Sequence, residues 1–165
     1  MVSKFQVVDE KVEAVPASKQ ALRLWLRLLS CSTMIEQRMR HLLKDKFGTT
    51  LPRFDFMATL YRFDEGLSMG ELSRWLMVSN GNVTGVADRL EKEGMIRRVP
   101  SPNDRRSQIV TMTPAGRAAF EEWAREHERW INDLFGKLDT EEMGRLIDLL
   151  AKVKDSVAHS EDNQS

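Results

Sequence analysis

A run of small polar residues, Ser79 to Gly85, has side chains that could read the edges of DNA bases. The run is Ser-Asn-Gly-Asn-Val-Thr-Gly, whereas an ordinary solvated helix carries Glu and Lys at such positions. Asn can pair with adenine through two hydrogen bonds, and a Thr methyl group can pack on the methyl group of thymine. We therefore predict that Asn80, Asn82 and Thr84 contact bases and that the bound half-sites contain informative A·T positions. The alternative is a plain turn and helix cap.

Two adjacent arginines, Arg105 and Arg106, lie in a polar loop between two β-prone runs, Ile96–Val99 and Gln108–Met112. Runs that flank a polar, proline-containing loop predict a hairpin. Paired arginines on a protruding loop suit a narrow, electronegative minor groove or the phosphates beside it. Asp104 has the wrong sign for a DNA contact, so we expect it to hold an arginine in position. The alternative is a pair of solvated surface charges.

Two short helices must position the polar run. Ser68 followed by Glu71 predicts a capping box at the start of a helix over 69–76. Ser79 predicts the cap of a second helix, which Gly94 ends, and the hairpin follows at once. This order predicts a winged helix-turn-helix, in which the second helix lies in the major groove of DNA. The candidate DNA-binding residues are Ser68, Ser79, Asn80, Gly81, Asn82, Thr84, Arg89, Asp104, Arg105 and Arg106.

Long amphipathic helices are predicted on both sides of this unit. Apolar residues recur at helical spacing over 18–46, and again from Phe120 to Val157 with a second capping box at Asp139 and Glu142. Their apolar stripes exceed what one small winged domain could cover, which predicts a homodimer. The expected fold class is mainly α with a small β-hairpin wing. The expected organisation is an N-terminal tail over 1–16, a helical dimerisation region over 17–50 and 114–158, the winged helix-turn-helix over 51–113, and a disordered tail over 159–165.

The composition narrows the class of protein. The 165 residues include 25 basic and 25 acidic ones, but seven Lys or Arg stand against two acids between Ala17 and Phe47, and such local clusters indicate partners better than net charge does. No apolar run is long enough for a membrane span, and a single cysteine favours a reducing, cytoplasmic compartment. We find no glycine-rich phosphate loop, no paired nucleophile and base, and no metal-ligand spacing. We therefore expect no enzyme activity, no cofactor and no metal.

With these residues in view, the chain resembles the MarR family of transcriptional regulators over roughly 21–157. The strongest part runs from Leu72-Ser73 to Gly94 and includes Asp-Arg-Leu-Glu-Lys-Glu-Gly. The wing matches the family's Asp-x-Arg pattern and its Leu-Thr-x-x-Gly exit, with Met112 in place of the usual Leu. The resemblance implies an obligate dimer on a palindromic operator, and repression that a ligand relieves. It places wing contacts at Arg106 and recognition-helix contacts at Ser79, Asn80, Asn82 and Thr84.

Arginines on the first helix could hold that ligand. Arg23, Arg27 and Arg38 fall on nearly one helical face, with aromatic and soft apolar residues expected nearby. Such a surface suits a small anionic aromatic ligand. The segment Leu22 to Leu29, together with Asn80 to Thr84, is similar to a MarR subgroup governing hydroxycinnamate breakdown, which implies a CoA thioester. The candidate ligand-binding residues are Trp25, Arg27, Met34, Arg38, His41, Phe54 and Tyr61.

Three alternatives remain open at this stage. The arginines of the first helix could simply solvate it or pair with acids of a partner subunit. Cys31 could sense peroxide, although a small buried hydrophobe is the plainer interpretation. The protein could also be a ligand-independent architectural DNA-binding protein, which uniform affinity for all sequences with a steep salt dependence would indicate.

Overall fold

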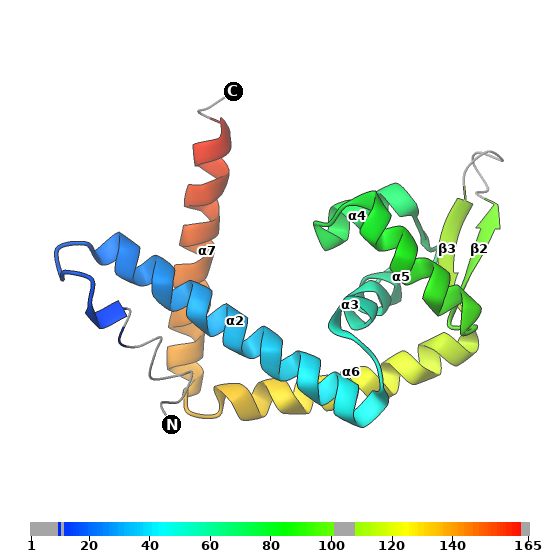
Figure 1. Cartoon of the computed structure of the whole chain (residues 1–165), viewed down its shortest axis with the longest axis horizontal. Helices are drawn as coiled ribbons and strands as arrows, with labels where there is room; N and C mark the ends of the chain where they lie inside the picture. The colour runs from blue at the N-terminus through cyan, green and yellow to red at the C-terminus, as the bar shows by residue number, and fades with distance from the viewer. Residues whose placement is uncertain (1–9, 11, 101–107, 163–165) are drawn as a thin grey trace. The chain divides into compact units, whose positions relative to one another are not determined.

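The computed structural model describes residue 10 and residues 12–100 and 108–162 (Figure 1). The chain divides into two compact units, residues 1–128 and 129–165. The elements in chain order are α2 (Gln20–Phe47), α3 (Leu51–Tyr61), β1 (Leu67–Ser68), α4 (Met69–Leu76), α5 (Asn80–Lys92), β2 (Ile96–Pro100), β3 (Gln108–Met112), α6 (Pro114–Phe135) and α7 (Thr140–Asp162). The predicted class, mainly helical with a small β wing, is confirmed.

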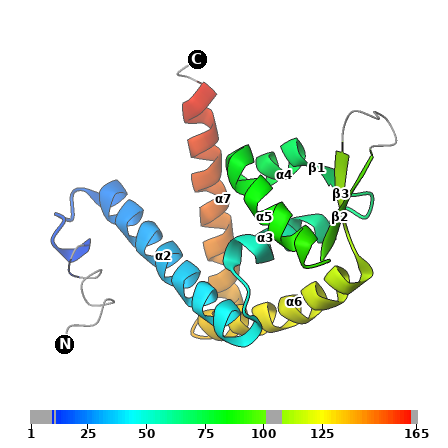
Figure 2. The ribbon, with the colours of Figure 1, turned by 45° about the vertical axis from the view of Figure 1, so that its right-hand side comes forward.

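A three-helix core and a small sheet form the winged part of the first unit (Figure 2). The antiparallel sheet has the order β1-β3-β2, with Arg98 opposite Val110 and Leu67 on the other side of Val110. Apolar side chains from α3, α4, α5 and the sheet meet in the core. Those fully buried include Phe56, Met57, Leu72, Val83, Leu90, Ile96 and Val110.

Local chemistry sets the helix starts. At α4, the Glu71 amide donates to Ser68 Oγ (3.3 Å), and the Ser68 amide donates to Glu71 Oε2 (2.8 Å). The predicted capping box is therefore present. The second predicted box is present too, since the Glu142 amide donates to Asp139 Oδ1 at 2.8 Å and the Asp139 amide donates to Glu142 Oε2 at 3.0 Å. Thr113 accepts the Gly116 amide at 2.9 Å at the start of α6.

Two glycines are required by close backbone approach. Gly66 has a φ of +81°, and a Cβ there would collide with the carbonyl of Val110. A Cβ on Gly116 would collide with the carbonyl of Met95, where the first turn of α6 lies on the backbone before β2. These glycines therefore hold β1 and α6 against the wing.

Some sequence-based boundaries need correction. Ser79 stands at the N-cap of α5, but its side chain makes no capping hydrogen bond. The tail expected to be disordered from residue 159 is helical as far as Asp162. No Gly or Pro interrupts that segment, and α7 simply continues with the His159 ring nitrogen 2.7 Å from the Asp155 carbonyl.

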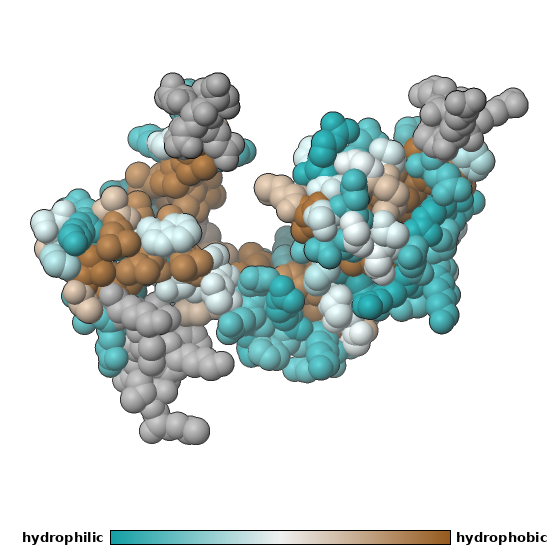
Figure 3. All heavy atoms as spheres, turned by 45° about the horizontal axis from the view of Figure 1, so that its top comes forward, coloured by the Kyte–Doolittle hydropathy of each residue, from teal (hydrophilic) through white to brown (hydrophobic). Residues whose placement is uncertain are grey.

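Each unit exposes a row of large apolar side chains. In the first unit, the N-terminal half of α2 exposes Leu22, Leu24, Trp25 and Leu29. In the second, α7 exposes Leu146, Ile147, Leu149, Leu150 and Val157. Figure 3 shows hydrophobic surface of this kind in brown. Among the described residues, no helix is long and apolar enough to cross a membrane.

Candidate nucleic-acid interface

Helix α5 buries one face and exposes a face of small polar residues. Val83, Ala87 and Leu90 are buried in the core, which turns the opposite side to solvent. The exposed residues of the first two turns are Asn80, Gly81, Asn82, Thr84 and Gly85. The Thr84 hydroxyl donates to the Asn80 carbonyl at 2.9 Å, so its hydrogen is already used within the helix. This face offers two amides, a methyl group and bare backbone.

The two glycines of this face are not required by the fold. Gly81 and Gly85 have no positive φ, and a Cβ at either position would meet nothing within 4 Å. Alanine would therefore fit both sites and favour the helix by about 1 kcal/mol at an interior position. Glycine at these positions weakens α5, and the absence of a side chain leaves the helix backbone accessible there.

Ser79 and Ser68, the residues before α5 and α4, differ in the hydrogen bonds of their side chains. Ser79 is exposed and its side chain makes no capping hydrogen bond. The amides of Asn82 and Val83 donate to the Ser79 carbonyl at 3.1 and 3.2 Å, so an anion such as a phosphate would be met by the amides of Asn80 and Gly81. At the start of α4, the Glu71 carboxylate accepts both the amide and the hydroxyl of Ser68. These hydrogen bonds lower the pKa of Glu71. A phosphate at α4 would meet this charge, which favours a capping role for Ser68.

An ion-paired arginine, Arg98, joins helix α5 to strand β2 of the wing. Arg98 of β2 donates to Asp88 Oδ1 at 2.6 Å and also bonds Glu91. Its backbone amide donates to Glu91 as well, at 3.1 Å. The hydrogen bond that Arg98 donates to Asp88 and the nearby charge of Glu91 raise the pKa of Arg98. The guanidinium thus fixes the base of the wing against α5.

The sequence interpretation missed this role of Arg98. The spacing of Asp88 and Glu91, one helical turn apart, ahead of a basic strand was a signal that could have suggested the pair. Arg89, predicted to bind DNA, is exposed on the same helix. Arg97 is exposed on β2 and its Nε donates to Thr111 across the sheet at 3.3 Å. Asp104, Arg105 and Arg106 lie outside the described residues.

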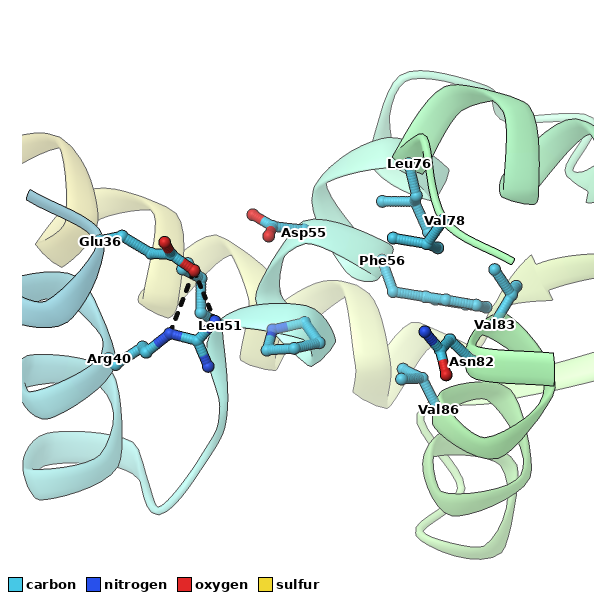
Figure 4. A pocket seen from close by; sticks show the side chains of 11 residues that line it. Glu36, Arg40, Leu51, Asp55, Phe56, Leu76, Val78, Asn82, Val83 and Val86 are labelled. Carbon is cyan, nitrogen blue, oxygen red and sulfur yellow. Dashed lines mark hydrogen bonds and ion pairs between the residues drawn. The ribbon is translucent and has the colours of Figure 1, made fainter. Parts of the chain in front are cut away.

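A pocket of about 430 Å³ opens between α2, α3 and α5. Figure 4 shows Glu36 and Arg40 of α2 facing α3, with Asn82 and Val83 reaching in from α5. The apolar part of the lining comes from α3, the end of α4, the turn that follows it, and α5. The lining residues are Glu36, Arg40, Leu51, Pro52, Asp55, Phe56, Leu76, Val78, Asn82, Val83 and Val86.

None of the seven residues predicted to bind a ligand lines this pocket. On α2, Trp25, Arg27, Arg38 and His41 are exposed and Met34 is half-buried. Phe54 is only 7% exposed. The role of these residues in ligand binding stays a prediction.

Phe54 and Tyr61 pack on α6. The ring of Phe54 lies 4.4 Å from that of His127, centroid to centroid, in a stacked arrangement. Burial lowers the pKa of His127, which favours the neutral ring. Tyr61 donates to Glu121 at 3.2 Å, and the guanidinium of Arg117 lies over its ring. These contacts anchor α3 to α6.

The structure places Cys31 differently from the plainer expectation. Cys31 is exposed on α2 rather than buried. Among the described residues, no group of three or more His, Cys, Asp and Glu side chains could hold a metal ion.

Comparison with known proteins gives one consistent result. The sequence model of the MarR family matches residues 49–108. The chain is 32% identical to the transcriptional activatory protein BadR of Rhodopseudomonas palustris, over 98% of this chain and 93% of that protein. It is similar to a crystal structure of a MarR family transcriptional regulator from Silicibacter pomeroyi, with 31% identity, a TM-score of 0.73, and coverage of 87% of this chain and 99% of that one.

A third comparison concerns a structure that contains DNA. The chain resembles a mutant of MarR from E. coli complexed with operator DNA, with 28% identity and a TM-score of 0.67. The match covers 77% of this chain and 93% of that one.

Proposed function

The chain belongs to the MarR family of transcriptional regulators, and on this premise we propose that it binds a palindromic operator as a homodimer under the control of a small ligand. Helix α5 would enter the major groove, and the wing would contact the backbone or minor groove. The protein is thus a DNA-binding transcriptional regulator of the MarR type.

One observation carries the DNA-reading part of the proposal. The exposed part of α5 includes Asn80, Asn82 and Thr84, together with Gly81 and Gly85, which the fold does not need. Amide side chains can pair with adenine through two hydrogen bonds, and the missing side chains of the glycines let the helix backbone approach the base edges. The wing arginines Arg105 and Arg106 would add affinity that is largely independent of sequence.

The apolar rows of α2 and α7 support a homodimer. Side chains such as Trp25 (57% exposed) and Ile147 (66% exposed) would stay in water in a single copy. Covering them in a second copy removes that apolar surface from water. A two-fold dimer would then present two recognition helices about 34 Å apart, one turn of DNA.

A mobility-shift titration tests the proposal. The probe is the DNA upstream of the protein's own gene, against a scrambled fragment of equal length. We expect tighter binding to the upstream fragment than to the scrambled one. A footprint on the upstream fragment should cover a two-fold symmetric site with A·T-containing half-sites. Equal affinity for both fragments, with a steep salt dependence, would instead indicate an architectural protein.

Repression and activation are both candidate outcomes of binding. The family resemblance implies repression, whereas the relative BadR is by its name an activatory protein. A reporter fused to the bound promoter decides between them. Deletion of the regulator raises the signal for a repressor and lowers it for an activator.

The ligand proposed from the sequence is a small anionic aromatic compound or its CoA thioester. Exposed Arg27 and Arg38 on α2 support it, because guanidinium groups suit carboxylates and phosphates, and His41 is exposed on the same helix. A thermal-shift screen of aromatic acids against their CoA esters tests this assignment. A response to peroxide that Cys31→Ser abolishes would support redox sensing instead.

A further inference from the structure

The dipeptide Asn80-Gly81 in the first turn of α5 has the chemistry of a modification site. Asn80 is the only asparagine of the chain that a glycine follows. The backbone nitrogen of the next residue can attack an asparagine side chain, and a side chain on that next residue shields the nitrogen. Because glycine has no Cβ, Asn-Gly is the pair in which this attack meets the least steric hindrance.

The structure leaves both reacting groups without a partner. Asn80 is exposed, and within the described residues no hydrogen bond joins its side-chain amide or the backbone amide of Gly81. A Cβ on Gly81 would meet nothing within 4 Å, so no other part of the fold lies against this residue. Asn82 differs, because the amide that follows it belongs to the buried, β-branched Val83 and donates to the Ser79 carbonyl at 3.2 Å.

The first turn of α5 is also held weakly. For the attack, the Gly81 nitrogen must approach Cγ of Asn80, which requires the backbone of Asn80 to leave the helical conformation briefly. The Ser79 side chain makes no capping hydrogen bond, and glycine within a helix lowers its stability. A helix end of this kind opens at a small cost in free energy while the core stays folded. The reactive conformation is therefore accessible in the folded protein.

We propose that Asn80 is a site of spontaneous deamidation. The Gly81 nitrogen loses its proton and attacks Cγ of Asn80. The bond from Cγ to the side-chain nitrogen then breaks, and that nitrogen takes up a proton and leaves as ammonia. Water opens the resulting succinimide ring at either carbonyl, which gives aspartate or isoaspartate and returns a proton to the Gly81 nitrogen. Overall, the amide and one water give a carboxylate and an ammonium ion, with no change in oxidation state.

The consequence for DNA binding is a step that rests on the proposed function. An amide offers adenine both a donor and an acceptor, whereas a carboxylate offers acceptors only. The new negative charge also repels the phosphates of DNA. Deamidation of Asn80 thus removes operator binding irreversibly and with time. Bound operator covers the first turn of α5 and slows the reaction.

Mass spectrometry of the DNA-free full chain measures the rate. The protein is held at pH 8 and 37 °C, sampled over days, and digested briefly with trypsin below pH 7. The tryptic peptide 75–89 contains both Asn80 and Asn82, so fragmentation shows which amide has become an acid. Asn80 is expected to convert at least tenfold faster than Asn82, and than the exposed Asn132 of α6. Equal rates at Asn80 and Asn82 overturn the proposal.

Two variants separate the chemistry from the stability of the helix. Gly81→Ala keeps Asn80 and places a methyl group beside the attacking nitrogen, in space that accepts it, and should slow deamidation at least tenfold. Gly85→Ala strengthens the same helix without altering the dipeptide, and should slow deamidation less than Gly81→Ala does. The proposal is overturned if the two variants deamidate equally. It is also overturned if wild type reacts more than tenfold slower than the synthetic peptide 75–89, which lacks the fold.

The effect on DNA binding is measured separately. Anion exchange isolates the deamidated protein by its added negative charge. Its operator Kd, and that of Asn80→Asp, should be at least tenfold weaker than that of fresh wild type, and saturating operator should slow deamidation at least fivefold. An unchanged Kd in the deamidated protein overturns the consequence for DNA binding. Absence of specific DNA binding by fresh protein, with rapid deamidation of Asn80, defeats only the proposed function.

Discussion

At the scale of single residues, Gly81 and Gly85 weaken helix α5, and no packing contact within the fold requires them. Gly66 and Gly116 sit where a Cβ would strike backbone, whereas Gly81 and Gly85 face open space. The first pair is therefore explained by packing. For the second pair we propose a cause outside the fold: under the proposed function, a methyl group on the exposed face would hold DNA away from the helix backbone.

Replacing Gly85 with alanine is expected to separate stability from DNA affinity. Gly85→Ala should raise the free energy of unfolding by about 1 kcal/mol, since alanine favours a helix interior. It should weaken operator binding by about tenfold, the order of one good base contact. Urea denaturation and mobility shifts measure the two effects. Gly144→Ala, on open surface of α7, is the control and should leave operator affinity unchanged; equal affinity of Gly85→Ala and wild type would contradict the assignment.

His127 gives a residue-scale prediction about pH. Its pKa is lowered by burial against Phe54, so the unfolded chain takes up a proton at higher pH than the folded chain does. Stability is therefore full above the ordinary histidine pKa of about 6.5 and falls as pH drops through that value towards the folded pKa. His127→Phe keeps a ring on Phe54 and should reduce the loss of stability between pH 7.5 and 5.5, measured by urea denaturation at both values. His159→Gln, an exposed position, should match wild type; an equal loss in His127→Phe would refute the role of His127.

At the scale of elements, the sequence predicted what local chemistry decides. Capping boxes at Ser68 and Asp139 and the stop at Gly94 could be predicted because their partners lie within a few residues. Strand β1 (Leu67–Ser68) could not be predicted, because two residues carry no periodic pattern and the strand is defined only by its pairing with β3. The pocket was missed for a similar reason, since its lining gathers residues from 36 to 86.

The link between α5 and β2 yields a prediction at this scale. Arg98→Gln removes the cation between Asp88 and Glu91 and leaves two carboxylates close together. We expect a loss of about 1 kcal/mol in the free energy of unfolding, a value reduced for partial exposure. Operator affinity should also fall, because the wing is no longer fixed to the recognition helix. Arg97→Gln, whose arginine donates to Thr111 rather than to acids, is the control for stability; equal destabilisation by the two changes would contradict the bridging role.

At the scale of the whole molecule, balanced charge and DNA binding are compatible. The 25 basic and 25 acidic residues cancel, so long-range attraction to DNA is weak and the contacts must come from local surfaces. On α5 the exposed residues of the first two turns, which we propose to read bases, are uncharged, and Arg89 and Lys92 lie in the later turns. Specificity is thus assigned to amides and backbone, and affinity to arginines beside them. The division follows from residue types and could be stated before the fold was known, whereas the fixing of the wing by Arg98 could not.

The final prediction concerns assembly. Ile147 is 66% exposed in the apolar row of α7, and the proposed dimer would bury it. Ile147→Glu should shift the protein from dimer to monomer in light scattering after size-exclusion chromatography, because a buried unpaired carboxylate is strongly unfavourable at an apolar interface. Operator affinity should fall by at least tenfold, since a monomer contacts one half-site. Lys152→Glu, an exposed charged position of the same helix, tests whether added acid alone has this effect. If Ile147→Glu remains a dimer with wild-type operator affinity, the α7 row does not form the interface and another apolar surface must hold the two copies together.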